Sequence, residues 1–145
     1  GEPLGEVVID QKACLYLPRV SAARVGQTVR FLNSDPVFHN VRSVSKSNRN
    51  FNKAMPKPNS SFTKSFDSAE IFVETKCSLH PWMKAYIAVV DHPFYAVTDE
   101  RGKFSISGLP QGHYAIEFWH EKFGKVTQDL FINQANNIFN FTYKE

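Results

Sequence analysis

Three side chains that bind metal ions lie in the short stretch 77–83: Cys77, His80 and Met83. Another histidine, His39, lies well upstream of them. One thiolate, two imidazoles and one thioether make up the ligand set of a mononuclear copper site of the electron-transfer type. The thiolate and thioether are soft ligands that suit copper, and imidazole suits it as well. The sequence therefore predicts one copper ion bound by His39, Cys77, His80 and Met83.

A disulfide between the two cysteines of the chain, Cys14 and Cys77, is the alternative interpretation. A disulfide gives no reason for His80 and Met83 to follow Cys77 at three-residue intervals. We therefore favour metal ligation by Cys77. Cys14 is then expected to be a free, buried, small apolar side chain, and the sequence gives no support for a role of Cys14 in the metal site.

The segments on both sides of the hairpin have the alternating apolar pattern of β-strands. A strand expected over 70–76 ends just before Cys77, and a strand expected over 84–90 begins just after Met83. One tight hairpin would therefore present three of the predicted ligands to a single point.

The fourth predicted ligand must come from another connection. His39 follows a strand expected over 28–32 and a turn signal over 33–36. Asn40 comes next and could hydrogen-bond to Ser78, which would tie the His39 loop to the ligand hairpin. Donors near the cysteine sulfur also tune the potential of such a site.

Short strands separated by turn residues recur along the whole chain, and no helical period is present. Residues 45–60 are rich in Ser, Asn, Lys and Pro and indicate a long surface loop. The fold class is therefore all-β, a sandwich or a barrel. The remaining strands of this part are expected over 6–10, 13–17, 41–44 and 61–66.

Residues 26–90 resemble a cupredoxin, the small blue-copper fold, in three places. These are the Gly26-Gln27-Thr28-Val29 start, the Asn33…Pro36…His39-Asn40-Val41 segment and the Cys77-Ser78-Leu79-His80-Pro81-Trp82-Met83 hairpin. The hairpin spacing is most similar to amicyanin, because plastocyanin-like members have a longer gap between the histidine and the methionine. The resemblance implies a Greek-key cupredoxin β-sandwich over 1–90 that carries single electrons outside the cytoplasm, in the periplasm or as a secreted protein.

In cupredoxins the histidine of the cysteine-containing loop reaches an apolar surface patch and acts as the electron port. The resemblance assigns this role to His80, framed by Pro81 and Trp82 in a patch for the redox partner. Phe38 and Leu79 are also apolar, and such neighbours would keep water away from the metal.

Residues 91–145 lie beyond the cupredoxin resemblance. The stretch 96–116 resembles the carboxypeptidase regulatory-like domain, a small transthyretin-type β-sandwich, in its turns at 99–102 and 109–112 and in its alternation. The resemblance implies a noncatalytic docking or stabilising module over 91–145, packed on the first domain or continuous with its core. Its strands are expected over 94–98, 103–107, 113–119, 126–132 and 138–143.

The formal net charge is +3, and the Lys and Arg residues are scattered rather than clustered. A mildly cationic surface would steer toward an acidic redox partner, such as an acidic c-type cytochrome or a copper enzyme. No nucleic-acid-binding motif accompanies the charge, and no apolar run is long enough for a transmembrane segment. We expect that a signal peptide has been removed from the chain.

Two functions of the copper site stay open. The ligand set fits an electron carrier, and it fits a copper-binding or delivery protein as well, since Cys, Met and His all suit Cu(I). A structural or adhesive module with incidental copper is a third class. We expect no enzymatic activity, because catalytic metal sites need an open coordination position or further metal ligands. The other histidines are expected in surface or structural positions: His92, His113 and His120.

Overall fold

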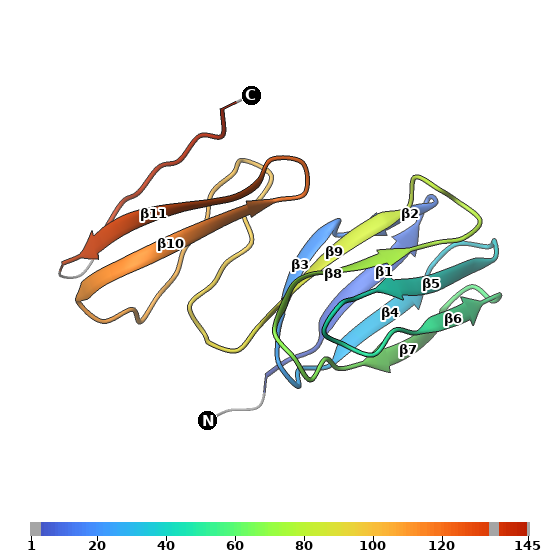
Figure 1. Cartoon of the computed structure of the whole chain (residues 1–145). Coiled ribbons are helices and arrows are strands. Elements are labelled where there is room, and N and C mark those ends of the chain that lie inside the picture. The colour runs from blue at the N-terminus through green and yellow to red at the C-terminus, as the bar shows by residue number, and fades with distance from the viewer. Residues whose placement is uncertain (1–3, 134–136, 145) are drawn as a thin grey trace. The chain divides into compact units, whose positions relative to one another are not determined.

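The computed structural model describes residues 4–133 and 137–144 of the chain. The chain divides into two compact units, Gly1–Phe104 and Ser105–Glu145. Over the described residues all regular elements are β-strands, and they form three sheets (Figure 1). The expected all-β class is thereby confirmed, whereas the domain boundary between residues 90 and 91 stays a prediction. None of the described residues belongs to a helix with the length and hydropathy of a membrane span.

The first sheet of the first unit has four strands. They are β1 (Val7–Lys12), β2 (Leu15–Leu17), β4 (Val29–Asn33) and β7 (Ser60–Lys64). Their order is β2-β1-β4-β7, in which β1 and β4 are parallel and the other pairs antiparallel.

The second sheet has five strands. They are β3 (Val20–Arg24), β5 (His39–Val44), β6 (Asn52–Met55), β8 (Glu70–Lys76) and β9 (Lys84–Val90). Their order is β3-β9-β8-β5-β6, with β3 parallel to β9. The chain passes several times from one sheet to the other, so neighbouring strands are often distant in sequence.

The core lies between the two sheets. Ile9 and Phe31 come from the first sheet, Val41, Val73 and Ile87 from the second, and all five side chains are fully buried in one cluster. Full burial of a side chain of this size stabilises the fold by about 1.5–3 kcal/mol. The alternation seen in the sequence thus corresponds to the inner faces of a β-sandwich.

The register of β5 and β8 positions the predicted ligands. The two strands are antiparallel neighbours, with Arg42 opposite Lys76. The start of one strand therefore lies near the end of the other. Because His39 begins β5 and Cys77 directly follows β8, both residues lie at the same end of the sandwich.

Two strands were not expected from the sequence. The expectation that 45–60 is entirely a surface loop is wrong, because Asn52–Met55 forms β6 at the edge of the second sheet. Only Met55 of this strand is buried, so β6 lacks the apolar alternation that would reveal it. β3 was missed because its buried positions are occupied by the small residues Ser21 and Ala23.

The second unit contains one antiparallel pair, β10 (Gly112–His120) and β11 (Gly124–Ile132). These strands confirm the expectations for 113–119 and 126–132. The other segments expected as strands of the C-terminal part are described but lie outside any strand: 94–98, 103–107 and 138–143.

Aromatic stacking covers one face of this pair of strands. Phe118 of β10 stacks on Phe139 and Phe141, with ring centroids 5.8 Å and 4.3 Å apart. The segment 138–143 therefore packs through its side chains rather than through a backbone ladder, which explains how an alternating sequence can lie outside a sheet.

Candidate metal centre

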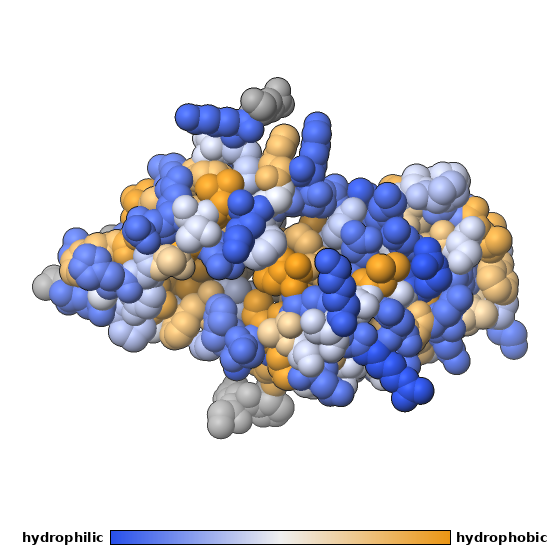
Figure 2. All heavy atoms as spheres, in the orientation of Figure 1, coloured by the Kyte–Doolittle hydropathy of each residue, from blue (hydrophilic) through white to orange (hydrophobic). Residues whose placement is uncertain are grey.

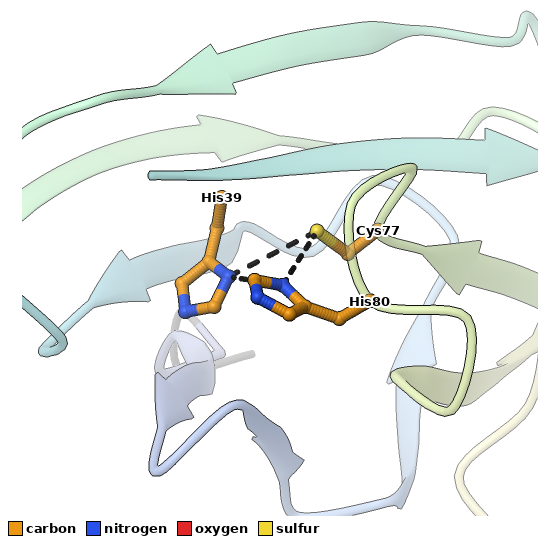
Figure 3. A group of neighbouring side chains, drawn as sticks. All are labelled: His39, Cys77 and His80. Atoms are coloured by element: carbon orange, nitrogen blue, oxygen red, sulfur yellow. Dashed lines mark hydrogen bonds between the residues drawn. The ribbon is translucent and has the colours of Figure 1, made fainter. Parts of the chain in front are cut away.

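Three of the predicted ligands converge at one end of the first unit (Figure 3). The Sγ atom of Cys77 lies 3.5 Å from Nδ1 of His80 and 3.9 Å from Nδ1 of His39. The two Nδ1 atoms are 3.2 Å apart. His39 is fully buried and Cys77 nearly so, while His80 is half-buried. One sulfur and two nitrogens thus form a small triangle.

The dimensions of this triangle fit a bound metal ion. Zinc, a comparable divalent ion, lies about 2.0 Å from histidine nitrogen and about 2.3 Å from cysteine sulfur. An ion in the plane of the donors, at trigonal angles, would then require about 3.7 Å between sulfur and nitrogen and about 3.5 Å between the nitrogens. The observed separations differ from these values by a few tenths of an ångström. The donors need little movement to coordinate an ion.

The turn before His39 is organised by a buried amide. The Asn33 side chain donates to the carbonyl oxygens of Val37 and Met55 at 3.2 Å and 2.9 Å, and its Oδ1 accepts from the Asp35 backbone N–H at 2.9 Å. Asn33 is fully buried, so these bonds satisfy its polar groups. They fix the path of the chain into β5 and hence the position of His39.

A backbone hydrogen bond closes the end of the hairpin that leads into β9. The backbone N–H of Met83 donates to the carbonyl of His80 at 2.9 Å. Met83 itself is 1% exposed and lies in the core, one residue before β9. The fourth predicted ligand is thus on the loop that carries Cys77 and His80, with its side chain directed into the interior.

The Asn40 and Ser78 side chains join the segments that carry His39 and Cys77. Asn40 Oδ1 accepts from the Ser78 backbone N–H at 2.7 Å, and Asn40 Nδ2 donates to Ser78 Oγ at 3.1 Å. Asn40 Nδ2 also donates to Asn52 Oδ1 on β6 at 2.9 Å. Since Ser78 is the residue after Cys77, this network holds the sulfur close to His39.

His39 is oriented by a carboxylate that the sequence did not identify. Asp35 Oδ2 lies 2.7 Å from Nε2 of His39, and the Asp35 carboxylate also accepts the backbone N–H groups of Ala13 and Cys14 at 2.7 Å and 2.9 Å. Burial alone would raise the pKa of Asp35, but the bonds from His39, Cys14 and Ala13 outweigh it and lower the pKa below its usual value. An ionised Asp35 keeps the His39 proton on Nε2 and leaves Nδ1 as a donor atom for a metal.

Tyr16 is a second residue that sequence reasoning missed. Its buried hydroxyl donates to the carbonyl oxygens of Lys76 and Asn40, at 3.1 Å and 3.3 Å. Burial, with a smaller contribution from Cys77, raises the pKa of Tyr16. For Asp35, the only signal in the sequence was its spacing of four residues from His39. For Tyr16 the sequence held no signal, because its partners are main-chain atoms.

The surface around His80 is apolar. Five exposed apolar side chains, here called the end patch, come from the start of β2 and from the connections at this end: Leu15, Val37, Phe38, Leu79 and Trp82. Figure 2 shows apolar residues at the end of the first unit where the β8–β9 connection lies. The Trp82 ring lies against His80, with centroids 5.3 Å apart, and Pro81 is exposed beside it. Of the two residues that frame His80 in the sequence, Trp82 thus also lies against its ring in space.

Both cysteines are free, which excludes a Cys14–Cys77 disulfide in this structure. Cys14 is half-exposed rather than buried, contrary to expectation. Its Sγ lies 3.8 Å from Nε2 of His80, whereas the Cys77 sulfur lies near the other ring nitrogen, Nδ1. Among the described residues, Cys14, Asp35 and His39 also form a group of potential metal-binding side chains.

No family model matches the sequence, and no curated protein matches it either. Solved structures do match. A reduced form and an oxidised form of two amicyanin mutants are each 25% identical, with a TM-score of 0.53, over 59% of this chain and 83% of theirs. A Cu-containing nitrite reductase from Thermus scotoductus SA-01 is 24% identical with a TM-score of 0.54, over 63% of this chain and 23% of that one. The first unit therefore has the cupredoxin fold.

Proposed function

We propose that the protein is a type 1 (blue) copper protein that carries single electrons between redox partners. The observation that carries this proposal is the Cys77–His39–His80 triangle, built from one sulfur and two Nδ1 atoms at separations of 3.2–3.9 Å. Its donor set is the one that blue-copper sites use. The similarity to amicyanin, some of whose matching structures are Cu(I) forms, supports the same conclusion.

The rigidity of the donors suits electron transfer. Copper when bound would supply a one-electron couple, and exchange is fast only if the ligands barely move between its two states. Here His39 is held by Asp35, Cys77 is followed by the Asn40–Ser78 network, and both lie at the ends of paired strands. The proposed ligands are thus already in position when the protein has folded, so a change in the copper oxidation state would require little movement of these side chains.

Met83 is the fourth ligand in this proposal. The chain has two methionines, and the sulfur of the other one, Met55, accepts a hydrogen bond from Gln11 Nε2 at 3.2 Å. Met83 is buried at the end of the hairpin and follows His80 at the interval found in amicyanin. A weakly bound thioether is the usual axial ligand of such a site.

We propose that electrons leave and enter through His80, and that the end patch docks a redox protein. Beside Trp82, a shallow cleft of about 200 Å³ is flanked by the cationic residues Arg19 and Lys84. Cations around an apolar surface favour an acidic partner, such as an acidic c-type cytochrome or a copper enzyme. The resemblance to cupredoxins is the basis for our proposal that the protein acts in the periplasm or as a secreted protein.

The C-terminal part, 91–145, is proposed to be a carboxypeptidase regulatory-like module with a docking or stabilising role and no catalytic one. The turn at 99–103 supports the proposal, since Asp99 Oδ1 accepts the backbone N–H groups of Arg101 and Lys103 at 2.9 Å. The long antiparallel pair β10–β11 with its aromatic face is the other support.

The test is optical and EPR spectroscopy of the full chain titrated with Cu(II). We expect an intense visible band from thiolate-to-copper charge transfer, saturating at one copper per chain. The band should vanish in Cys77→Ala and persist in His92→Ala, a histidine on the exposed segment after β9. A wild-type protein that binds copper without this band would contradict the proposal.

A second measurement separates a carrier from a delivery protein or an enzyme. The burial of His39 and Cys77 favours a carrier, because a delivery site must open to a partner. We expect rapid electron self-exchange and slow loss of Cu(I) to a chelator. Fast loss of copper with slow self-exchange would instead indicate delivery, and turnover of a substrate would indicate an enzyme.

A further inference from the structure

The outer edge of the His80 ring faces a thiol. Nδ1 of His80 points to Cys77 and His39, whereas its Nε2 lies 3.8 Å from Sγ of Cys14. If Nδ1 binds a metal, the ring proton is on Nε2, and Cys14 is then placed to accept it in a hydrogen bond. The half-buried edge of His80 is therefore covered by a specific side chain from the β1–β2 turn.

The conformation of this turn makes the choice of residue unusual. Ala13 and Cys14 both have positive φ, 52° and 54°. Tight hairpin turns with two such residues favour Asn-Gly or Asp-Gly, because most other residues are strained there. An Ala-Cys pair therefore costs conformational energy that the turn itself does not require. The thiol at this position calls for another explanation, and its contact with His80 supplies one.

The turn is held against both histidines. Asp35 accepts the backbone N–H groups of Ala13 and Cys14 and at the same time contacts Nε2 of His39. On the other side, Trp82 Nε1 donates to the carbonyl of Cys14 at 2.7 Å. The turn is thus fixed from the His39 side by a carboxylate and from the His80 side by the indole that packs on that ring.

We propose that Cys14 is a positioning residue for His80. Its sulfur accepts the Nε2 proton, restrains the ring and increases the donor strength of Nδ1 toward the metal, as Asp35 does for His39. This inference rests on the proposed function, since it assigns to Cys14 a role at the same metal site. A thiol is a weaker acceptor than a carboxylate, so the two histidines are held unequally, with His80 the less firmly oriented of the two.

The test compares Cys14→Ala and Cys14→Ser in the full chain, with Lys12→Ala as control. Lys12 is an exposed residue of β1 next to the turn. We expect Cys14→Ala to weaken Cu(II) binding on the order of tenfold, the effect typical of losing a partner of a ligating histidine. A tenfold loss confined to the oxidised form corresponds to a rise in reduction potential of about 59 mV. Cys14→Ser, whose hydroxyl can accept the same proton, should recover part of both changes.

Ring-nitrogen NMR of the metal-free protein provides a readout independent of copper. We expect the Nε2 resonance of His80 to shift in Cys14→Ala and to stay unchanged in Lys12→Ala. Unchanged copper affinity and unchanged His80 resonances in Cys14→Ala would overturn the inference. It would also be overturned if alanine and serine weakened copper binding equally and lowered the unfolding free energy of the metal-free protein, because Cys14 would then act only on the turn. If the wild type formed no blue centre, the proposed function would fail, while the NMR comparison would still decide whether Cys14 orients His80.

Discussion

Asp35 Oδ2 lies 2.7 Å from Nε2 of His39, four residues further along the chain. The same carboxylate accepts two backbone N–H groups from the β1–β2 turn. One side chain therefore fixes both the tautomer of a buried imidazole and the turn that faces the second imidazole. The Asp35 carboxylate thereby links the connection that leads to His39 with the β1–β2 turn.

Replacement of Asp35 by Asn should weaken copper binding without removing it. The amide keeps the shape of the side chain but loses the charge that holds the proton on Nε2 of His39. We expect a ten- to hundredfold lower Cu(II) affinity, measured by competition with a chelator of known affinity. Asp67→Asn, on the exposed segment before β8, is the matched control and should leave the affinity unchanged. Equal affinities of wild type and Asp35→Asn would show that the contact does not tune the site.

Loss of the Tyr16 hydroxyl should destabilise the end of the sandwich that carries the proposed ligands. Tyr16→Phe would leave the carbonyl groups of Lys76 and Asn40 without this donor. The expected cost is about 1–3 kcal/mol in the free energy of unfolding, measured by urea denaturation of the metal-free protein. Tyr95→Phe, in the segment that follows β9, controls for removal of a hydroxyl elsewhere. An unfolding free energy equal to that of the wild type would contradict the role assigned to Tyr16.

Replacing Asn40 should affect copper retention more than replacing Ser78. Asn40→Ala removes the acceptor of the Ser78 backbone N–H and the donor to Asn52, whereas Ser78→Ala removes a single side-chain acceptor. We therefore expect Cu(I) loss to a chelator to be faster in Asn40→Ala than in Ser78→Ala. Double-mutant analysis checks the coupling, since residues of one network should have non-additive effects. Additive effects, or a larger effect of Ser78→Ala, would refute the arrangement.

The sequence was sufficient to predict that His39, Cys77 and His80 meet, for a physical reason. Cys77 and His80 are brought together by local chain geometry, and His39 by the pairing of β5 with β8, two segments that the sequence predicts as strands. A cluster of such side chains can thus be predicted when its members are close in sequence or begin and end segments that are recognisable as strands.

The contacts that position the proposed ligands could not be predicted from the sequence in the same way. The partner of Cys14 is His80, which lies on a distant loop, and their meeting depends on how the β1–β2 turn lies against the β8–β9 connection. Tyr16 binds carbonyl groups, which every residue carries, so no residue type in the sequence marks its partners. β6 was missed because an exposed edge strand is held by its backbone rather than by apolar side chains.

Glu70 should make the stability of the first unit depend on pH. Partial burial of its carboxylate would raise the pKa, but hydrogen bonds outweigh burial and lower the pKa of Glu70 below its ordinary value of 4.5. The donors are the Ser45 hydroxyl, the backbone N–H groups of Lys46 and Ser47, and the Asn48 amide. A lowered pKa means that the folded state holds the proton less tightly than the unfolded state does. The stabilisation is therefore complete above about pH 4.5 and is lost as the pH falls through the lower folded-state pKa.

Glu70→Gln removes the ionised carboxylate and should abolish this dependence. At neutral pH we expect the variant to be less stable by about 1 kcal/mol, a modest value because the group is partly exposed. The difference from wild type should shrink as the pH is lowered below 4.5. Urea denaturation of the metal-free proteins at a series of pH values measures it, with Glu100→Gln in the exposed turn after residue 98 as the control for losing a carboxylate. A difference that stayed constant down to low pH would mean that Glu70 acts through its shape rather than through its charge.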